Sequence, residues 1–384
     1  MQKLPNSLAK KIEKRKLDKS FRILDTASGL IDFTSNDYLG FSQNENLFSK
    51  TFQLLLTENI AQNGATGSRL LSGNHKLYEN LEPLLANFYK ADDALVFNSG
   101  YDANMGFFSA VPQRGDCIFY DEFIHASIRE GIRMSNAKGY HFSHNNIESL
   151  KEKIETNTSQ LGEDGNIYVV TESVFSMDGD TPDLKALAAF TKTNSYHLIV
   201  DEAHAVGAHG TNGNGIIPQL KLEKKVFARI ITFGKAYGCH GAAILGSSDL
   251  KDYLVNFAKS FIYTTALTPH TLATIITAHK FYEQSGKEEV TRLKNNIVYF
   301  KNELKTQGLQ EHFILSDAAI QSCIIKGIGK AKAVADKLMD KGFGVKAILS
   351  PTVPEGQERL RFCIHSYNSK EELGLVLKLL SKYI

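Results

Sequence analysis

Short apolar runs alternate with stretches of helical periodicity between about residues 90 and 246, and this alternation constrains the fold more than any other feature. Six runs of four residues lie at 94–97, 117–120, 167–170, 197–200, 230–233 and 242–245. Continuous apolar runs are typical of strands that helices cover on both faces. The sequence therefore predicts an α/β fold with a mostly parallel sheet, whose ligands bind beyond the carboxyl ends of the strands.

The segments that flank this pattern have a different organisation. The first 45 residues contain a charged helix and a turn-rich stretch, which together indicate an N-terminal arm. After residue 275, a long polar helix precedes apolar runs at 320–325 and 360–362. We therefore expect an arm at 1–45, a large domain at 46–275 and a smaller C-terminal α+β domain at 276–384.

Composition excludes several classes of partner. The chain has 44 Lys and Arg residues against 42 Asp and Glu residues, with no basic stripe, so nucleic acid is not an expected partner. No apolar run approaches the roughly 18 residues of a membrane span, and we expect a cytoplasmic protein. The four cysteines are scattered, as in reduced proteins. Cys239 lies four residues after Lys235, where a nearby cation is expected to lower its pKa.

A lysine with glycines on both sides follows the apolar run at 230–233. Lys235 lies in T-F-G-K-A-Y-G, where Gly234 and Gly238 are expected to leave room for a ring beside the amine. A lysine after a strand is ordinarily a solvated surface residue, but such a residue needs no small neighbours. Burial would lower the pKa of the amine toward that of a nucleophile. Lys235 is therefore a candidate for covalent attachment of a cofactor.

The run at 197–200 ends in D-E-A-H, and its Asp201 could keep a pyridine nitrogen protonated. The same letters occur in nucleic-acid helicases, but those enzymes also need a phosphate loop of the form G-x-x-x-x-G-K-[ST], which this chain lacks. A metal site formed by His204 and His209 is disfavoured because Gly207 interrupts the segment between them. A pyridine cofactor fits this position better.

Other strand ends carry polar residues that suit the same ligand. His125 could stack on a planar ring, although a capping or core histidine is equally consistent with its segment. The turn at 98–104 could bind phosphate through backbone N–H groups, and Gly100 permits close approach, although an ordinary helix cap explains it as well. Asp178-Gly179-Asp180 lacks the other ligands of a calcium loop, so it indicates a turn, and no metal site is expected.

Taken in order, these segments resemble the motifs of the α-oxoamine synthases, a family of fold-type I pyridoxal-phosphate enzymes. The resemblance covers most of the chain. The matching segments are S-N-D-Y-L-G at 35–40, G-A-T-G-S-R-L-L-S-G-N-H at 64–75, N-S-G-Y-D-A-N at 98–104, H-A-S at 125–127, T-E-S-V-F-S-M-D-G-D at 171–180, D-E-A-H at 201–204, T-F-G-K at 232–235, P-T-V-P-E-G at 351–356 and R-L-R-F at 359–362. The resemblance implies a mostly parallel seven-stranded sheet and a smaller C-terminal α+β domain.

The resemblance also implies a role for each matched residue. Lys235 holds pyridoxal 5'-phosphate as a Schiff base, Asp201 pairs with the pyridinium nitrogen and His125 stacks on the ring. His204 is the partner of the phenolic oxygen of the ring. The remaining implied cofactor contacts are Gly100, Tyr101, Ser176, Thr232 and, from the second subunit of a homodimer, Thr264 and Thr265. The implied substrate contacts are Arg361, Asn36, Arg22 and Thr352.

The activity implied by the resemblance is a decarboxylative condensation of a small amino acid with an acyl thioester. P-T-V-P-E-G and G-S-R-L-L-S-G are most similar to members that join L-alanine to a pimeloyl group on CoA or a carrier protein, in biotin biosynthesis. Relatives that use glycine or serine with another acyl-CoA are the alternative within the family. A non-catalytic partner subunit is disfavoured because Lys235 and Asp201 are both present.

Overall fold

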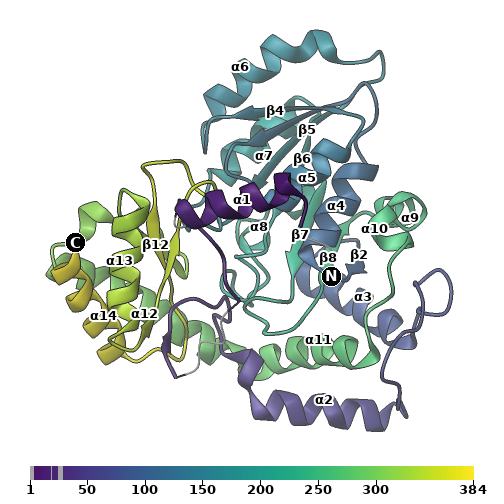
Figure 1. Ribbon diagram of the computed structural model, residues 1–384. Helices are drawn as coiled ribbons and strands as arrows, with labels where there is room; N and C mark the ends of the chain where they lie inside the picture. Colours follow the sequence, from purple (N-terminus) through teal and green to yellow (C-terminus); the bar gives the residue numbers. More distant parts are fainter. Residues whose placement is uncertain (1–3, 19, 25–28) are drawn as a thin grey trace.

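A seven-stranded sheet lies at the centre of the molecule (Figure 1). The computed structural model describes residues 4–18, 20–24 and 29–384. The strand order is β2-β8-β7-β6-β5-β3-β4, and β8 alone runs antiparallel to its neighbours. The strands are β2 (Asp93–Phe97), β3 (Cys117–Asp121), β4 (Lys138–Phe142), β5 (Ile167–Glu172), β6 (His197–Asp201), β7 (Ala228–Thr232) and β8 (Ala242–Gly246). The predicted α/β fold with a mostly parallel sheet is confirmed.

Helices pack on both faces of this sheet, which explains the continuous apolar runs. Val169 and Val170 are neighbours in β5 but belong to two different buried clusters, because successive side chains point to opposite faces. One cluster includes residues of α4 and α5, and the other includes residues of α6 and α7. The helices up to the end of the sheet region are α1 (Asn6–Leu17), α2 (Glu45–Thr57), α3 (Lys76–Tyr89), α4 (Gly100–Ala110), α5 (Ala126–Met134), α6 (Ile147–Asn157), α7 (Leu184–Thr193), α8 (Ile216–Gln219), α9 (Ser248–Phe257), α10 (Lys259–Ile262) and α11 (Pro269–Phe281).

The apolar runs identified six of the seven strands, and β4 is the one that they missed. Its sequence, K-G-Y-H-F, alternates weakly and includes only one fully buried residue, Phe142. β4 lies at the edge of the sheet and pairs only with β3. An edge strand with an open face needs no apolar run, so the pattern that marks the central strands is absent.

A three-stranded antiparallel sheet, in the order β11-β12-β9, forms the C-terminal part. A short parallel pair, β1 with β10, joins this part to the N-terminal segment. The elements are β1 (Ile31–Asp32), β9 (Ile320–Ile324), β10 (Phe343–Gly344), β11 (Lys346–Ile348), β12 (Arg359–Cys363), α12 (Lys287–Thr306), α13 (Ile328–Met339) and α14 (Lys370–Tyr383). Throughout the described ranges, no helix is both long and apolar enough to cross a membrane.

The predicted domain limits remain a proposal. The limit at residue 275 falls inside α11, which continues through a π-helical turn at Tyr282–Gly286 into α12. One buried cluster contains Phe33, Leu272 and Leu377 and so extends through all three predicted parts. Within the predicted arm, residues 1–3, 19 and 25–28 lie outside the described residues.

Gly238 connects the loop after β7 to the N-terminal segment. Its φ is +59°, and a Cβ there would lie 2.1 Å from the amide nitrogen of Ser42. The expectation that Gly238 leaves room for a cofactor is therefore wrong, because the backbone at Phe41 and Ser42 occupies that space. Gly234 is less crowded, since its nearest neighbour would be the carbonyl oxygen of Cys239 at 3.5 Å.

Replacement of Gly238 by alanine is expected to lower the free energy of unfolding by about 2 kcal/mol or more, because the Cβ both clashes and strains the backbone. Gly329→Ala in α13 is the matched control, since a Cβ there meets nothing within 4 Å. The control should leave stability unchanged or raise it by up to about 1 kcal/mol. Urea unfolding followed by circular dichroism measures both, and equal effects would contradict this account of Gly238.

Candidate active site

The carboxyl ends of three adjacent parallel strands bring together an amine and two carboxylates. Glu172 ends β5, Asp201 ends β6, and these two residues are register partners. Lys235 follows the end of β7, the strand beside β6. The charges of Asp201 and Glu172 both act on the Lys235 amine. Sequence reasoning placed Lys235 and Asp201 at the same edge, and the structure does so too.

Burial sets the protonation of this group. Burial lowers the pKa of the Lys235 amine, and the charges of Asp201 and Glu172 offset part of that effect, which leaves the pKa at about 8. Burial raises the pKa of Glu172 well above its usual value, and the negative charge of Asp201 adds to this effect. Glu172 also accepts the backbone N–H of His125 at 2.6 Å. A lysine with this pKa has a substantial neutral fraction near pH 8 and can act as a nucleophile or a base.

A chain of hydrogen bonds fixes Asp201 relative to His125. The Asn104 side-chain amide donates to Oδ2 of Asp201 at 3.1 Å and to Oγ of Ser127 at 3.0 Å. Nδ1 of His125 lies 2.7 Å from the Ser127 hydroxyl, while the His125 side chain as a whole is exposed. Sequence reasoning did not single out the Asn104 side chain. Its position one helical turn after Gly100 on α4 could have indicated that it faces the strand ends.

His204 is buried and held by a tyrosine from the N-terminal segment. The Tyr38 hydroxyl lies 2.7 Å from Nδ1 of His204 and also donates to Oδ1 of Asn36 at 3.3 Å. Burial lowers the pKa of His204 well below its usual value, so the imidazole is neutral at neutral pH. The sequence contains Tyr38 in the motif at 35–40 but does not indicate this contact. The hydrogen bond fixes the ring of His204 and leaves Nε2 for another partner.

Arg361, on β12, lies beside two of the predicted site residues. Its guanidinium donates to Oδ1 of Asn36 at 2.9 Å and to the carbonyl oxygen of Ser176 at 3.0 Å. Arg359 is buried instead, and its guanidinium pairs with Asp178. The side chain available at this place for an anionic substrate is therefore that of Arg361, which the resemblance implied as a substrate contact.

The N-terminus of α4 faces the end of β7. Ser99 caps the helix by accepting the backbone N–H of Asp102 at 3.0 Å. A Cβ on Gly100 would lie 3.8 Å from Cβ of Thr232, so these two predicted phosphate contacts are adjacent. The Thr232 hydroxyl donates to the carbonyl oxygen of Gly241 at 3.0 Å. Unpaired N–H groups at a helix start are suited to binding a phosphate group.

Three other predicted contacts lie near this turn. The Asn98 side chain donates to Oγ1 of Thr264 at 3.0 Å and to the carbonyl oxygen of Thr265 at 2.7 Å, in the same chain. Tyr101 is exposed, and its hydroxyl bonds to Glu130. The expected contribution of Thr264 and Thr265 to a second subunit remains a prediction.

The predicted substrate contacts of Arg22 and Thr352 remain predictions. Arg22 is exposed, and no hydrogen bond or ion pair joins it to another residue within the described ranges. Thr352 lies in an exposed turn whose backbone bonds to Leu349. The expectation for Cys239 is wrong, because burial, together with the charge of Asp37, raises the pKa of its thiol.

The residues present fit a flat phosphorylated pyridine cofactor. A shielded amine, a buried carboxylate and an exposed imidazole lie at one edge of the sheet, beside a helix N-terminus that can hold a phosphate. Asn104 adds a buried Oδ1 without a hydrogen-bond partner among the described residues. These are the groups that sequence reasoning assigned to pyridoxal phosphate.

Comparison with known proteins gives a consistent result. Residues 28–378 match the family model for aminotransferase class I and II. An 8-amino-7-oxononanoate synthase from Emericella nidulans is 37% identical over 377 residues, covering 93% of this chain and 90% of that protein. A crystal structure of 8-amino-7-oxononanoate synthase from Francisella tularensis has a TM-score of 0.77 at 30% identity, covering 93% of this chain and 98% of that one. A serine palmitoyltransferase from S. paucimobilis with bound PLP-myriocin aldimine has a TM-score of 0.87 at 25% identity, over 98% and 96% of the two chains.

These similarities extend over nearly the whole chain rather than over one motif. They include the sheet, the site at its carboxyl edge and the C-terminal part that carries Arg361. Both kinds of relative are α-oxoamine synthases. The chain belongs to the aminotransferase class I and II family and, within it, to the α-oxoamine synthases of pyridoxal-phosphate fold type I.

Proposed function

We propose that this protein condenses L-alanine with a pimeloyl thioester, releasing carbon dioxide and the free thiol, to give 8-amino-7-oxononanoate. The observation that carries the proposal is the shielded Lys235 amine beside Asp201, in a site whose other side presents Arg361 and Asn36. The choice of substrates is supported by relatives named 8-amino-7-oxononanoate synthase that are 37% and 36% identical over most of this chain.

Lys235 is both the cofactor attachment residue and the base in this proposal. Pyridoxal phosphate, when bound, withdraws electrons from the α-carbon of the amino acid. With a pKa of about 8, the Lys235 amine can accept the α-proton at slightly alkaline pH. Arg361 and Asn36 bind the carboxylate of the amino acid and so orient the α-hydrogen toward this amine.

The other residues position and polarise the cofactor. Asp201, fixed by Asn104, is placed to hold a proton on the ring nitrogen. His125 stacks on the ring, and the neutral imidazole of His204 binds its phenolic oxygen. The N-terminus of α4, with Gly100 and Thr232, binds the phosphate.

A serine palmitoyltransferase-like activity is the second candidate. It is supported by the TM-score of 0.87 to the S. paucimobilis enzyme, whose identity to this chain is only 25%. Just after β12, the buried His365 bonds to Ser35 and Asn368 rather than facing open space. This histidine therefore gives no argument for a longer acyl chain.

We further propose that the protein acts as a homodimer. Phe48, Phe52 and Leu56 form an apolar stripe on α2, with 67%, 57% and 60% of each side chain exposed. Leu70 and Leu71, in the motif at 64–75, are also exposed. Several large apolar side chains exposed together on one surface commonly mark a protein interface.

A cytoplasmic location is also part of the proposal. What supports it is that the four cysteines, Cys117, Cys239, Cys323 and Cys363, are free thiols. Free buried thiols are typical of proteins from reducing compartments.

A substrate panel tests the reaction. Release of free thiol should be fastest with L-alanine and a pimeloyl thioester, and slower by at least about tenfold with glycine and acetyl-CoA or serine and palmitoyl-CoA. Thiol release is measured with a chromogenic disulfide, and the aminoketone is identified by mass spectrometry. Both CoA and carrier-protein thioesters should be assayed. Absence of any response to alanine would exclude the proposed substrate and leave the cofactor assignment standing.

Lys235→Ala tests the attachment site. The variant should lose activity by about a thousandfold or more, because it removes both the attachment point and the base. In the unmodified protein, borohydride reduction should fix pyridoxal phosphate on the peptide that contains Lys235, as read by mass spectrometry. Fixation on a different lysine would exclude the assignment. Lys224→Ala, at an exposed lysine paired with Asp92, is the matched control and should retain full activity.

The pH dependence of Lys235 gives a test without substrate. Because its pKa is lowered to about 8, the amine becomes neutral as pH rises through 8 rather than near the usual 10.5. In protein stripped of cofactor, the rate of Lys235 labelling by an amine-reactive reagent should therefore rise with a midpoint near pH 8. Asp201→Asn removes a charge that raises this pKa and should move the midpoint lower. A midpoint equal to that of exposed lysines would refute the effect of burial.

A further inference from the structure

The segment 173–180, between β5 and α7, is held by the C-terminal part of the chain. The Ser316 hydroxyl donates to the carbonyl oxygen of Gly179 at 2.8 Å, and the Ser322 hydroxyl donates to that of Met177. Arg361 donates to the carbonyl oxygen of Ser176 at 3.0 Å. The segment therefore lies between the two sheets and contacts both. Its Ser176 carbonyl accepts a hydrogen bond from Arg361, the proposed carboxylate-binding residue.

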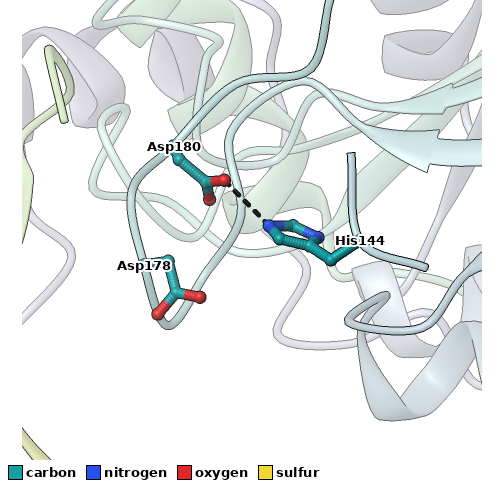
Figure 2. A group of neighbouring side chains, drawn as sticks. All are labelled: His144, Asp178 and Asp180. Carbon is teal, nitrogen blue, oxygen red and sulfur yellow. Dashed lines mark hydrogen bonds and ion pairs between the residues drawn. The ribbon is translucent and has the colours of Figure 1, made fainter. Parts of the chain in front are cut away.

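A histidine holds the same segment from the side of the large sheet. Nδ1 of His144 lies 2.8 Å from Asp121, at the end of β3, and Nε2 lies 2.8 Å from Asp180, at the end of the segment. Figure 2 shows the imidazole facing Asp180 from the neighbouring loop. The rings of Phe123 and Phe175 pack on His144 with centroids 4.5 Å away. Both ring nitrogens are thus bonded, and two aromatic rings pack against the imidazole from loops that lead to the site.

These residues form an ion-pair network rather than a metal site. Ligand atoms of His144, Asp178 and Asp180 lie within 4.8 Å of one another, a spacing that a metal ion could use. However, both nitrogens of His144 already bond to carboxylates, and Asp178 pairs with Arg359. The two cations that face these carboxylates are protonated His144 and Arg359.

The surroundings keep His144 protonated at neutral pH. Burial would lower the pKa of its imidazole, but hydrogen bonds to Asp121 and Asp180, and their charges, raise it to about 9. Glu122 also faces this residue, because its carboxylate accepts the His144 backbone N–H at 2.9 Å. Because the pKa of His144 is raised on folding, its protonated form stabilises the folded protein. This contribution is complete below about pH 6.5 and is lost as pH rises through about 9.

We propose that His144 is a positioning residue for amino-acid binding, which fixes the segment 173–180 against the large sheet and thereby sets the place of Arg361 relative to Lys235. The inference rests on the proposed function, in which Arg361 binds the substrate carboxylate. His144 itself touches neither cofactor nor substrate. Without its bridge, the segment would keep two hydrogen bonds on the side of the large sheet, from the Asn145 side chain to Asp180 at 2.6 Å and from the Ser173 backbone to Asp201 at 2.8 Å. It would lose the charged link to the end of β3, and Arg361 would bind the carboxylate less well.

His144→Gln is the principal test, with His141→Gln as matched control on the exposed face of β4. In the cofactor-loaded protein, the dissociation constant for L-alanine is measured from the change in cofactor absorption. The introduced glutamine side chain is neutral and reaches only one carboxylate, so binding should weaken about tenfold. The spectrum without amino acid should be unchanged, and the control should bind alanine like the unmodified protein.

Two further measurements separate positioning from a general loss of stability. Backbone hydrogen exchange in a peptide covering 173–180 should be faster in His144→Gln and unchanged in the control. The dissociation constant for alanine in His144→Gln is divided by that of the unmodified protein. This ratio should fall toward one as pH rises through about 9, because His144 of the unmodified protein then loses its positive charge. If His144→Gln does not fold, Asp180→Asn should show the same changes to a smaller degree.

The outcomes are decisive. Equal alanine affinity and equal exchange in His144→Gln and the unmodified protein would overturn the positioning role, as would a ratio that does not change with pH. If the unmodified protein gives no spectral response to alanine, the proposed substrate fails. The hydrogen-exchange comparison then still decides whether His144 fixes the segment 173–180.

Discussion

The shielding of one lysine amine beside two carboxylates is the constraint on which the rest of the site depends. Charges removed from water are costly unless they are compensated, so Lys235 needs Asp201 close by, and Glu172 is favoured in its neutral form. This compensation requires β5, β6 and β7 to end side by side. The parallel order and the register of these three strands are therefore requirements of the chemistry as well as of the fold.

The site is built by two sheets and one N-terminal segment. The large sheet supplies Lys235 and Asp201, whereas β12 supplies Arg361. Asn36 and Tyr38 link them, because Tyr38 bonds to His204 while Asn36 accepts a hydrogen bond from Arg361. A shift of one sheet against the other would separate the cofactor groups from the carboxylate-binding arginine. The segment 173–180 lies at the place where such a shift would occur.

Sequence reasoning succeeded where a residue's position follows from strand order. Asp201 ends one central strand and Lys235 follows the end of the next by three residues, so their meeting at one edge could be expected. It failed where neighbours come from distant parts of the chain. A glycine is required at 238 because the backbone at Ser42 lies against it, and not because a cofactor needs the space. The pKa of Cys239 was expected to be lowered by a nearby cation, but burial raises it. Arg22 is exposed, and its predicted contact with the substrate remains a prediction.

The sequence by itself determined the mostly parallel sheet, the family and the identity of the groups at the strand ends. It could do so because helix-covered strands require continuous apolar runs, and because motifs in a fixed order follow those strands. Only the tertiary structure decided the pairing of His144 with Asp180, of Tyr38 with His204 and of Arg359 with Asp178. Such pairs, and the pKa values that they set, depend on burial and distance, which arise only when segments far apart in sequence pack together.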